Sequence, residues 1–263
     1  PLLTMNRALN QLRDEIKYWT QRDWEMADVA AYFDWLAADY DHINEGADSY
    51  FRRFTDTLRV ADLPDGAHFL DFQARSGNGT AEFYKAGKVG TAVCADVSPE
   101  MGKICLERVR AAGLQAVRWV HITDYNWPFE TGEFDITLCL ESIEHFSKPF
   151  YLLHELSRVT RPGGTLILST PNVFWEPMHA LAAITGLHHS EGPHRFLGYG
   201  RLQSMIRDVG FDIEHSETTV LIPAGPDWFI NFGYWLEART KNTLMPLIGL
   251  RRLFICRKRE GGD

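Results

Sequence analysis

The chain has 263 residues, a length that suits one large α/β domain or a domain with a modest addition. Its 27 Lys and Arg residues against 35 Asp and Glu residues give a formal net charge of −8, which argues against nucleic-acid partners because phosphate backbones attract clustered cations. The four cysteines show no CxxC spacing, and no apolar run approaches the ~18 residues of a membrane helix. We therefore expect a cytoplasmic protein with reduced thiols, no transmembrane segment and a small-molecule substrate.

The order of the expected elements indicates a parallel sheet. Residues 6–63 carry apolar side chains at helical spacing, and two or three helices are expected there. From residue 67 onward, short apolar strands alternate with amphipathic helices, which is typical of a parallel sheet covered on both faces. Strands are expected near 67–72, 90–95, 116–121, 134–140, 164–170, 211–216 and 253–257, and helices over 80–86, 99–112, 149–159 and 200–209.

The stretch "LDFQARSGNGT", residues 70–80, predicts a ligand-binding turn. Asp71 ends the first strand, and Gly77 and Gly79 permit a close approach of the backbone to a ligand at the start of the next helix. The second strand ends in Asp96, where an acid accepts hydrogen bonds from ribose hydroxyls. This pattern fits NAD as well as S-adenosylmethionine, so other segments must decide between them.

Two later segments decide it. "ITDYNWPFETGEFDITLCLESIEHF" and "LLHELSRVTRPGGTLILSTPN" together closely resemble the class I S-adenosylmethionine-dependent methyltransferases, specifically those that act on small molecules. The resemblance extends over about residues 67–211. It implies an α/β fold with a Rossmann-like, seven-stranded, mostly parallel sheet, helices on both faces and an N-terminal helical cap. We expect the cap over 1–63 and the methyltransferase domain over 64–263, with lid insertions near 171–198 and 221–245.

The resemblance also assigns a set of residues to the cofactor, S-adenosylmethionine, and to its product S-adenosylhomocysteine. Asp71 and the loop behind it would lie against the methionine part, Asp96 would hold the ribose, and Asp124 with Tyr125 would face the adenine. Glu141 would contact the cofactor or order its loop. The full set is Asp71, Gln73, Gly77, Asp96, Val97, Met101, Asp124, Tyr125 and Glu141.

The loop departs from the family pattern at two positions. Family members usually have glycines two and four residues after the strand-end acid, whereas this chain has Gln73 and Arg75 there, and Gly77 alone matches. Either the loop still binds, with Gly77-Asn78-Gly79 forming the tight turn, or the side chains of Gln73 and Arg75 obstruct the cofactor. Arg75 would also bring a cation close to a sulfonium. The second account makes the protein a weak or inactive methyltransferase-fold scaffold.

Candidate catalytic residues follow the fourth strand. Methyl transfer to an alcohol or phenol needs a positioned acceptor and a base, and His145 is the first candidate for that base. Glu141, Glu144 and His145 would share one face if this segment is helical. Glu144 and the distant His194 are further candidates for substrate-facing groups. A structural role for His145 is an equally open interpretation.

The same residues support an alternative function. Glu141, Glu144 and His145, together with His188, His189, Glu191 and His194, have the oxygen and nitrogen donors that a divalent cation accepts. This arrangement is similar to metal-dependent small-RNA ribose methyltransferases, although the acidic composition argues against RNA. We therefore assign no metal ligands.

Aromatic-rich stretches interrupt the later alternation. Phe174, Trp175, Tyr199, Trp228, Phe229 and Tyr234 are candidate linings of an apolar acceptor pocket. The amphipathic stretch 228–250 covers this pocket, rests on a membrane surface or closes a homodimer. The main hypothesis is methyl transfer to an oxygen, or to a nitrogen or carbon, of a small-molecule acceptor.

Overall fold

The computed structural model describes residues 23–44, 46–185, 192–241, 243 and 245–260, together with Arg13 and Lys17. Its strands are β1 (Ala67–Phe72), β2 (Val89–Asp96), β3 (Val117–His121), β4 (Phe134–Leu140), β5 (Thr160–Pro171), β6 (Phe211–Thr219) and β7 (Arg251–Lys258). The helices are α2 (Met26–Asn44), α3 (Asp48–Val60), α4 (Asn78–Lys85), α5 (Pro99–Ala111), α6 (Pro149–Val159), α7 (Glu176–Thr185), α8 (Tyr199–Asp208), α9 (Asp227–Thr240) and α10 (Met245–Ile248), with short 3-10 turns η1 (Ile143–His145) and η2 (Val173–Trp175).

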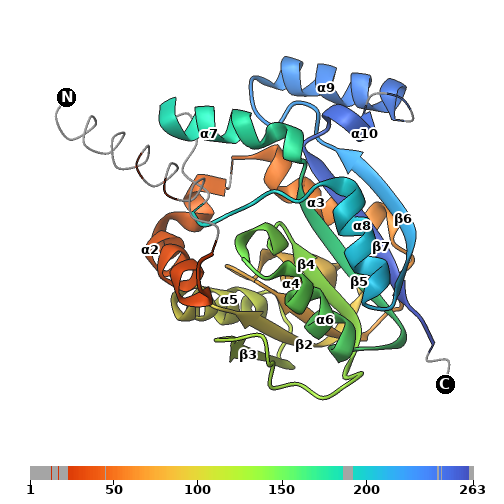
Figure 1. Cartoon of the computed structure of the whole chain (residues 1–263). Coiled ribbons are helices and arrows are strands. Elements are labelled where there is room, and N and C mark those ends of the chain that lie inside the picture. Colours follow the sequence, from red (N-terminus) through yellow and green to blue (C-terminus); the bar gives the residue numbers. More distant parts are fainter. Residues whose placement is uncertain are drawn as a thin grey trace.

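The described strands form one seven-stranded sheet in the order β3-β2-β1-β4-β5-β7-β6 (Figure 1). β1 to β5 pair in parallel, and β7 is antiparallel to both of its neighbours. The chain therefore runs outward from β1 in one direction and from β4 in the other. The loops that leave β1 and β4 lie at this switch point, where open α/β sheets bind their ligands.

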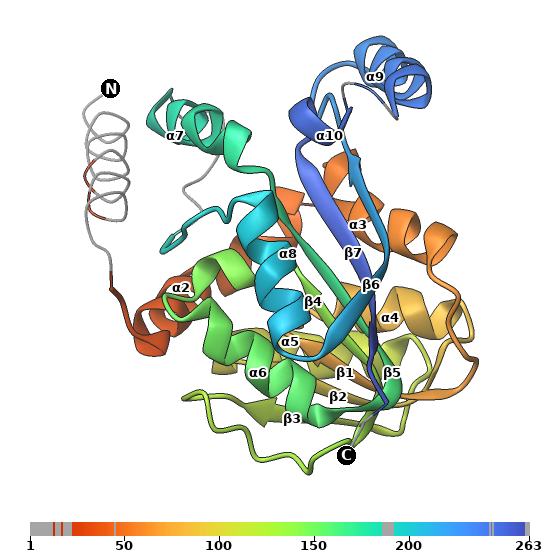
Figure 2. The same cartoon turned by 45° about the vertical axis from the view of Figure 1, so that its right-hand side comes forward.

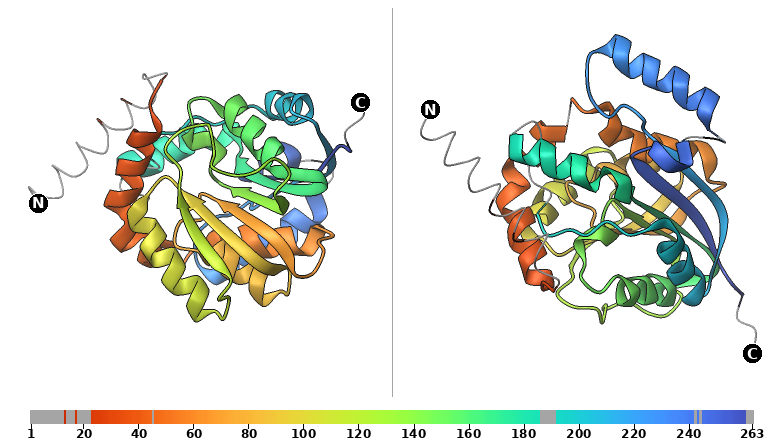
Figure 3. Two further views of the ribbon diagram at one scale, coloured as in Figure 1. Left: turned by 90° about the horizontal axis from the view of Figure 1, so that it is seen from below. Right: turned by 45° about the horizontal axis from the view of Figure 1, so that its top comes forward.

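Helices cover both faces of the sheet, which confirms the predicted layers. α4 and α5 pack against each other and against β2 on one face, whereas α6 and α8 lie together on the other (Figure 3). The strands between them are buried over most of their length, as expected for a sheet covered on both sides. Ser98 caps α5 with its hydroxyl, which accepts from the Met101 N–H at 3.1 Å.

Element boundaries differ from the predicted ones by a few residues. β5 begins at Thr160, four residues before the expected strand, because Thr160 already pairs with Phe134 of β4. α4 begins at Asn78 because Gly77 takes the left-handed conformation of its N-cap position. α2 and α3 supply the expected N-terminal helices, while α7, α9 and α10 lie at one end of the molecule (Figure 2). None of the described helices is long and apolar enough to span a bilayer.

Gly102 of α5 lies directly against the Trp119 ring of β3, and a substitution at Gly102 tests how closely this helix packs on the sheet. A Cβ on Gly102 would overlap the ring of Trp119, so we expect Gly102→Ala to lower the free energy of unfolding by about 1–3 kcal/mol. Gly200→Ala in α8 is the matched control, because no atom lies within 4 Å of that Cβ position. Urea unfolding of both variants measures the difference, and equal stabilities would contradict the contact.

Candidate functional site

The loop after β1 keeps the backbone shape of a glycine loop without two of the glycines. Gln73 has φ +59° and Arg75 has φ +52°, both in the left-handed region that favours glycine. Such a conformation costs a non-glycine residue on the order of 1–3 kcal/mol, so the surroundings must impose it. The N–H groups of Gln73 and Ala74 both donate to the carbonyl of Ala95, which ties the loop to the end of β2.

Gly77 is the position at which a side chain has no room. Its φ is +82°, and a Cβ there would lie 3.0 Å from the Cys105 carbonyl and from Val109 on α5. The packing of α5 thus requires glycine at this position, while the predicted approach of a ligand to Gly77 stays a prediction.

Asp71 lies at the N-terminus of α4. Its Oδ2 accepts from the Thr80 N–H at 3.1 Å and from the Thr80 hydroxyl at 2.8 Å, which satisfies a free N–H of the first helical turn. Burial raises the pKa of Asp71 from its ordinary 3.8 to about 7, against the opposing effect of the Thr80 hydrogen bonds. The acid that ends β1 thus orders the helix behind the loop.

Asp96 ends β2 and is completely buried. Its Oδ2 accepts from the Arg75 N–H at 2.8 Å, and its Oδ1 accepts from the Ser98 N–H at 2.9 Å. Burial raises the pKa of this carboxyl, and the nearby Arg75 cation opposes the rise. Both side-chain oxygens therefore bind protein donors in this structure.

The Arg75 side chain lies over this acid and under the cap. Its guanidinium carbon is 3.3 Å from the centre of the Phe33 ring of α2, its Nη1 is 3.9 Å from Asp96 Oδ1, and Nη1 also donates to Gln73 Oε1. Arg75 and Gln73 are 6% and 3% exposed. Arg75 Nη2 and Gln73 Nε2 are buried donors with no hydrogen-bond partner, a deficit of about 1–3 kcal/mol each.

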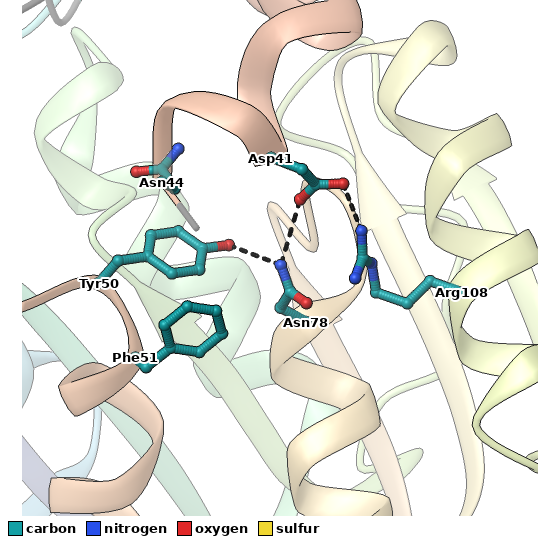
Figure 4. A pocket seen from close by; sticks show the side chains of 6 residues that line it. All are labelled: Asp41, Asn44, Tyr50, Phe51, Asn78 and Arg108. Atoms are coloured by element: carbon teal, nitrogen blue, oxygen red, sulfur yellow. Dashed lines mark hydrogen bonds and ion pairs between the residues drawn. The ribbon is translucent and has the colours of Figure 1, made fainter. Parts of the chain in front are cut away.

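A polar cluster ties α2 to the same loop. Asp41 accepts from the Ser76 hydroxyl at 2.6 Å, from Asn78 Nδ2 at 3.3 Å and from Arg108. Asn78 also donates to the Tyr50 hydroxyl at 3.1 Å, and these side chains border a pocket of about 140 Å³ that Asp41, Asn44, Tyr50, Phe51, Asn78 and Arg108 line (Figure 4). Because the lining includes neither Asp71 nor Asp96, this pocket belongs to the junction between the cap and the loop.

The residues assigned to the adenine lie around the exit of β2 and β3. Val97 and Met101 are fully buried, while Asp124 is exposed and accepts from the Asn126 N–H at 2.7 Å. Tyr125 is half-buried, and its hydroxyl accepts from the Lys148 N–H at 3.3 Å. No described contact joins these residues to one another, so their role stays a prediction.

The three polar residues after β4 do not share one face. Glu141 has φ +48° and ends the strand, and only Ile143–His145 form a helical turn. Glu141 Oε1 accepts from the Ser169 hydroxyl at 2.7 Å and from Arg251 Nε at 3.1 Å, whereas Glu144 Oε2 accepts from the Thr170 hydroxyl at 2.9 Å. The one-face arrangement expected for a helical segment is wrong because the backbone reverses at Glu141.

His145 is brought next to a segment that follows it by almost fifty residues. Its Nδ1 is 2.8 Å from the Pro193 carbonyl, and the Arg195 N–H donates to the Glu144 carbonyl at 2.8 Å. His194, between these two positions, is buried, and its Nδ1 is 2.9 Å from the Gly192 carbonyl. The His145 ring also forms a T-shaped contact with the Phe33 ring, with 5.3 Å between the ring centroids.

Phe33 and Asp34 were not predicted. Phe33 contacts both Arg75 and His145, and Asp34 accepts from the Ser98 hydroxyl at 2.6 Å and from the Glu100 N–H at 3.2 Å. In the sequence they resemble any aromatic and acid of an amphipathic helix, so no local signal distinguishes them.

The described residues include no group of three or more His, Cys, Asp or Glu side chains arranged for a metal ion. His188, His189 and Glu191 lie outside the described residues. The predicted aromatic lining is also dispersed: Trp228 is 72% exposed and Phe174 is 65% exposed, and Tyr234 donates to Asp48 at 2.7 Å.

The donor set around the loop fits a nucleoside that carries positive charge. Asp71 and Asp96 are two buried acids, and the Arg75 guanidinium lies 3.9 Å from Asp96 and acts electrostatically on both carboxyls. Unsatisfied donors on Gln73 and Arg75 add groups that a carboxylate or hydroxyl could accept from. S-adenosylmethionine combines a sulfonium, an amino group, a carboxylate and ribose hydroxyls, which is the chemistry that this set can bind.

Comparisons with known proteins agree with this geometry. A family model described as a methyltransferase domain matches residues 70–168. The ubiquinone/menaquinone biosynthesis C-methyltransferase UbiE of Erwinia tasmaniensis is 28% identical over 221 residues, which cover 74% of this chain and 87% of that protein. The ubiquinone biosynthesis O-methyltransferase of Xanthomonas axonopodis pv. citri is 26% identical over 159 residues, 57% of this chain and 65% of that protein.

A solved structure shows the same fold. The phosphoethanolamine N-methyltransferase 2 of Haemonchus contortus, in complex with phosphomonomethylethanolamine and S-adenosylhomocysteine, has a TM-score of 0.63 at 16% identity, over 90% of this chain and 59% of that chain. The match to UbiE of Shewanella pealeana spans 61% of that protein. The sheet order, the loop after β1 and these matches support a class I S-adenosylmethionine-dependent methyltransferase, and the relatives that this chain resembles are methyltransferases of small molecules.

The raised pKa of Asp71 predicts a pH-dependent stability. The folded protein retains a proton that the unfolded chain releases between about pH 4 and pH 7, so stability falls as pH rises through this window and levels off above it. Asp71→Asn lacks this dependence. The free energy of unfolding of the variant minus that of the natural chain should therefore increase by on the order of 1–4 kcal/mol from pH 4 to pH 8, measured by urea unfolding. Asp65→Asn, at an exposed acid, is the control, and a difference for Asp71→Asn that does not vary with pH contradicts the assignment.

Proposed function

We propose that this methyltransferase acts on a hydroxyl oxygen of a small molecule, with Asp71, Asp96 and the loop between Gln73 and Gly77 as the cofactor site. The observation that supports this most directly is the loop itself, which keeps its left-handed backbone at Gln73 and Arg75 although neither is glycine. A strained conformation persists where the surroundings over-determine it, and such sites cluster where ligands bind. When bound, S-adenosylmethionine supplies an electrophilic methyl group.

His145 is the base in this proposal. Its Nδ1 lies 2.8 Å from the Pro193 carbonyl, which can only accept, so Nδ1 carries the hydrogen and Nε2 is the unprotonated nitrogen of the neutral ring. This tautomer leaves Nε2 to take the proton of the acceptor hydroxyl while the oxygen is methylated. His194 and Glu144 lie on the segments that hold His145, and we assign them to the acceptor side of the site.

Other residues of the chain position these groups. Glu141 links β4 to β5 and β7 through Ser169 and Arg251, and it holds the turn that presents η1. Trp24 donates from Nε1 to the His145 carbonyl at 2.7 Å, which fixes the N-terminal segment over η1 and excludes water from that side. The relatives include enzymes named as C- and as O-methyltransferases, and a buried imidazole base favours oxygen because a hydroxyl proton has to be removed.

The role of Asp96 predicts a loss of cofactor affinity. Asp96→Ala removes an acceptor of charge-assisted hydrogen bonds, so we expect S-adenosylhomocysteine to bind about 1.5–3 kcal/mol more weakly in calorimetric titrations. Asp65→Ala is the matched control, because Asp65 is exposed ahead of β1. Unchanged affinity in Asp96→Ala, with the fold intact by circular dichroism, would remove Asp96 from the cofactor site.

The role of His145 predicts a loss of turnover. His145→Gln keeps a hydrogen-bonding side chain of similar size, so we expect kcat to fall about 10²-fold or more while the affinity for S-adenosylhomocysteine stays within a factor of two. The assay follows transfer of a labelled methyl group to a panel of small phenols and hydroxy acids. His154→Gln, on the exposed side of α6, is the control. A variant that loses only thermal stability would identify His145 as structural.

A further inference from the structure

The Arg75 side chain occupies the place next to the acid that would hold the ribose. Its guanidinium lies between the Phe33 ring and the Asp96 carboxylate, at 3.3 Å from the ring centre and 3.9 Å from Oδ1. Asp96 is 0% exposed as a result of this cover and of the N–H groups that bind it. A ligand with ribose hydroxyls reaches Asp96 only after the Arg75 side chain has moved.

Helix α2 holds this side chain in place. The Phe33 ring of α2 lies against the Arg75 guanidinium. Two acids of the same helix, Asp34 and Asp41, attach it to neighbouring elements. Asp34 binds the start of α5 through the Ser98 hydroxyl and the Glu100 N–H, and Asp41 binds Ser76, Asn78 and Arg108 around α4. The attachments of α2 are therefore to the cofactor loop and to the two helices that follow β1 and β2.

The buried arrangement is incomplete, which makes it displaceable. Arg75 Nη2 and Gln73 Nε2 have no hydrogen-bond partner, and both residues have left-handed backbones. A side chain that had evolved as a permanent part of the core would have its donors satisfied. Among the attachments of α2, the ion pair between Asp41 and Arg108 is about one-third exposed, so water can replace its partners there. Val29 and Leu36 of the same helix are buried in the core, and lifting of α2 has to expose them.

We propose that Arg75 is an internal cationic plug of the cofactor site, that α2 lifts to release it, and that the positive charge of S-adenosylmethionine then replaces that of Arg75 beside Asp71 and Asp96. This inference rests on the proposed function, because it concerns admission to the same site. The exchange keeps one cation next to two buried acids in both states, so neither state leaves the acids uncompensated. Arg75 thereby controls which ligands enter as well as how fast they enter.

The test removes the plug and, separately, its attachment. Arg75→Gly restores the residue type that a positive φ favours, and Asp34→Asn weakens the hold of α2 on α5 without touching the loop. We expect both variants to bind S-adenosylhomocysteine with an association rate constant at least tenfold higher than that of the natural chain, followed by stopped-flow tryptophan fluorescence. Asp39→Asn, an exposed acid on the same helix, is the matched control and is expected to leave the rate unchanged.

A comparison of two ligands tests the charge exchange. S-adenosylmethionine carries a sulfonium where S-adenosylhomocysteine has a neutral sulfur. We expect Arg75→Gly to tighten S-adenosylmethionine by at least tenfold more than it tightens S-adenosylhomocysteine, because the variant leaves Asp71 and Asp96 without a resident cation. Calorimetric titration of both ligands into both proteins gives the four dissociation constants.

Each other outcome overturns the proposal in a distinguishable way. If Arg75→Gly binds either ligand more weakly than the natural chain does, Arg75 is a ligand of the cofactor and not a plug. If Arg75→Gly does not fold, equal association rates in Asp34→Asn and Asp39→Asn reject the lifting of α2. If no variant binds either ligand, the plug and the proposed function fall together. If the variants bind faster and tighter as expected while no acceptor is methylated, the plug stands and the proposed catalysis alone is wrong.

Discussion

The two hydrogen bonds to the Asp96 carboxylate determine the shape of the whole site. One oxygen binds the Arg75 N–H and the other binds the Ser98 N–H, so a single side chain at the end of β2 joins the loop after β1 to the start of α5. This bridge fixes the peptide at Arg75, and with it the left-handed backbone on either side of Ala74. The hydrogen bonds from the Gln73 and Ala74 N–H groups to the Ala95 carbonyl add to this bridge, and together they hold a glutamine and an arginine in conformations that favour glycine.

Phe33 connects this loop to the residues after β4. Its ring contacts the guanidinium of Arg75 and the imidazole of His145, which come from opposite sides of the topological switch point. A movement of α2 therefore alters the surroundings of the cofactor loop and of the candidate base together. Coupling of this kind requires only that one rigid element contacts both groups.

The sequence predicts what depends on near neighbours and misses what depends on the cap. The acids at 71 and 96 near the strand ends and the glycine at 77 follow from local patterns, and the structure has each of them where the pattern places it. The arrangement of Glu141, Glu144 and His145 was missed because one residue with positive φ breaks the helical spacing. The contact of Phe33 with Arg75 joins residues 42 positions apart, and helix periodicity fixes only that Phe33 faces inward.

The loss of two glycines and the retention of the third have a common physical cause. A Cβ at residue 77 would meet the backbone and side chains of α5 at 3.0 Å, and a helix cannot withdraw without opening the face of the sheet. The Arg75 side chain instead meets α2, where its guanidinium lies against the Phe33 ring. The side chain at 75 therefore contacts the cap, whereas position 77 is enclosed by α5. The choice of residue at 75 thus depends on the cap as well as on the loop. The aromatic ring at position 33 is the group of the cap that contacts the Arg75 side chain.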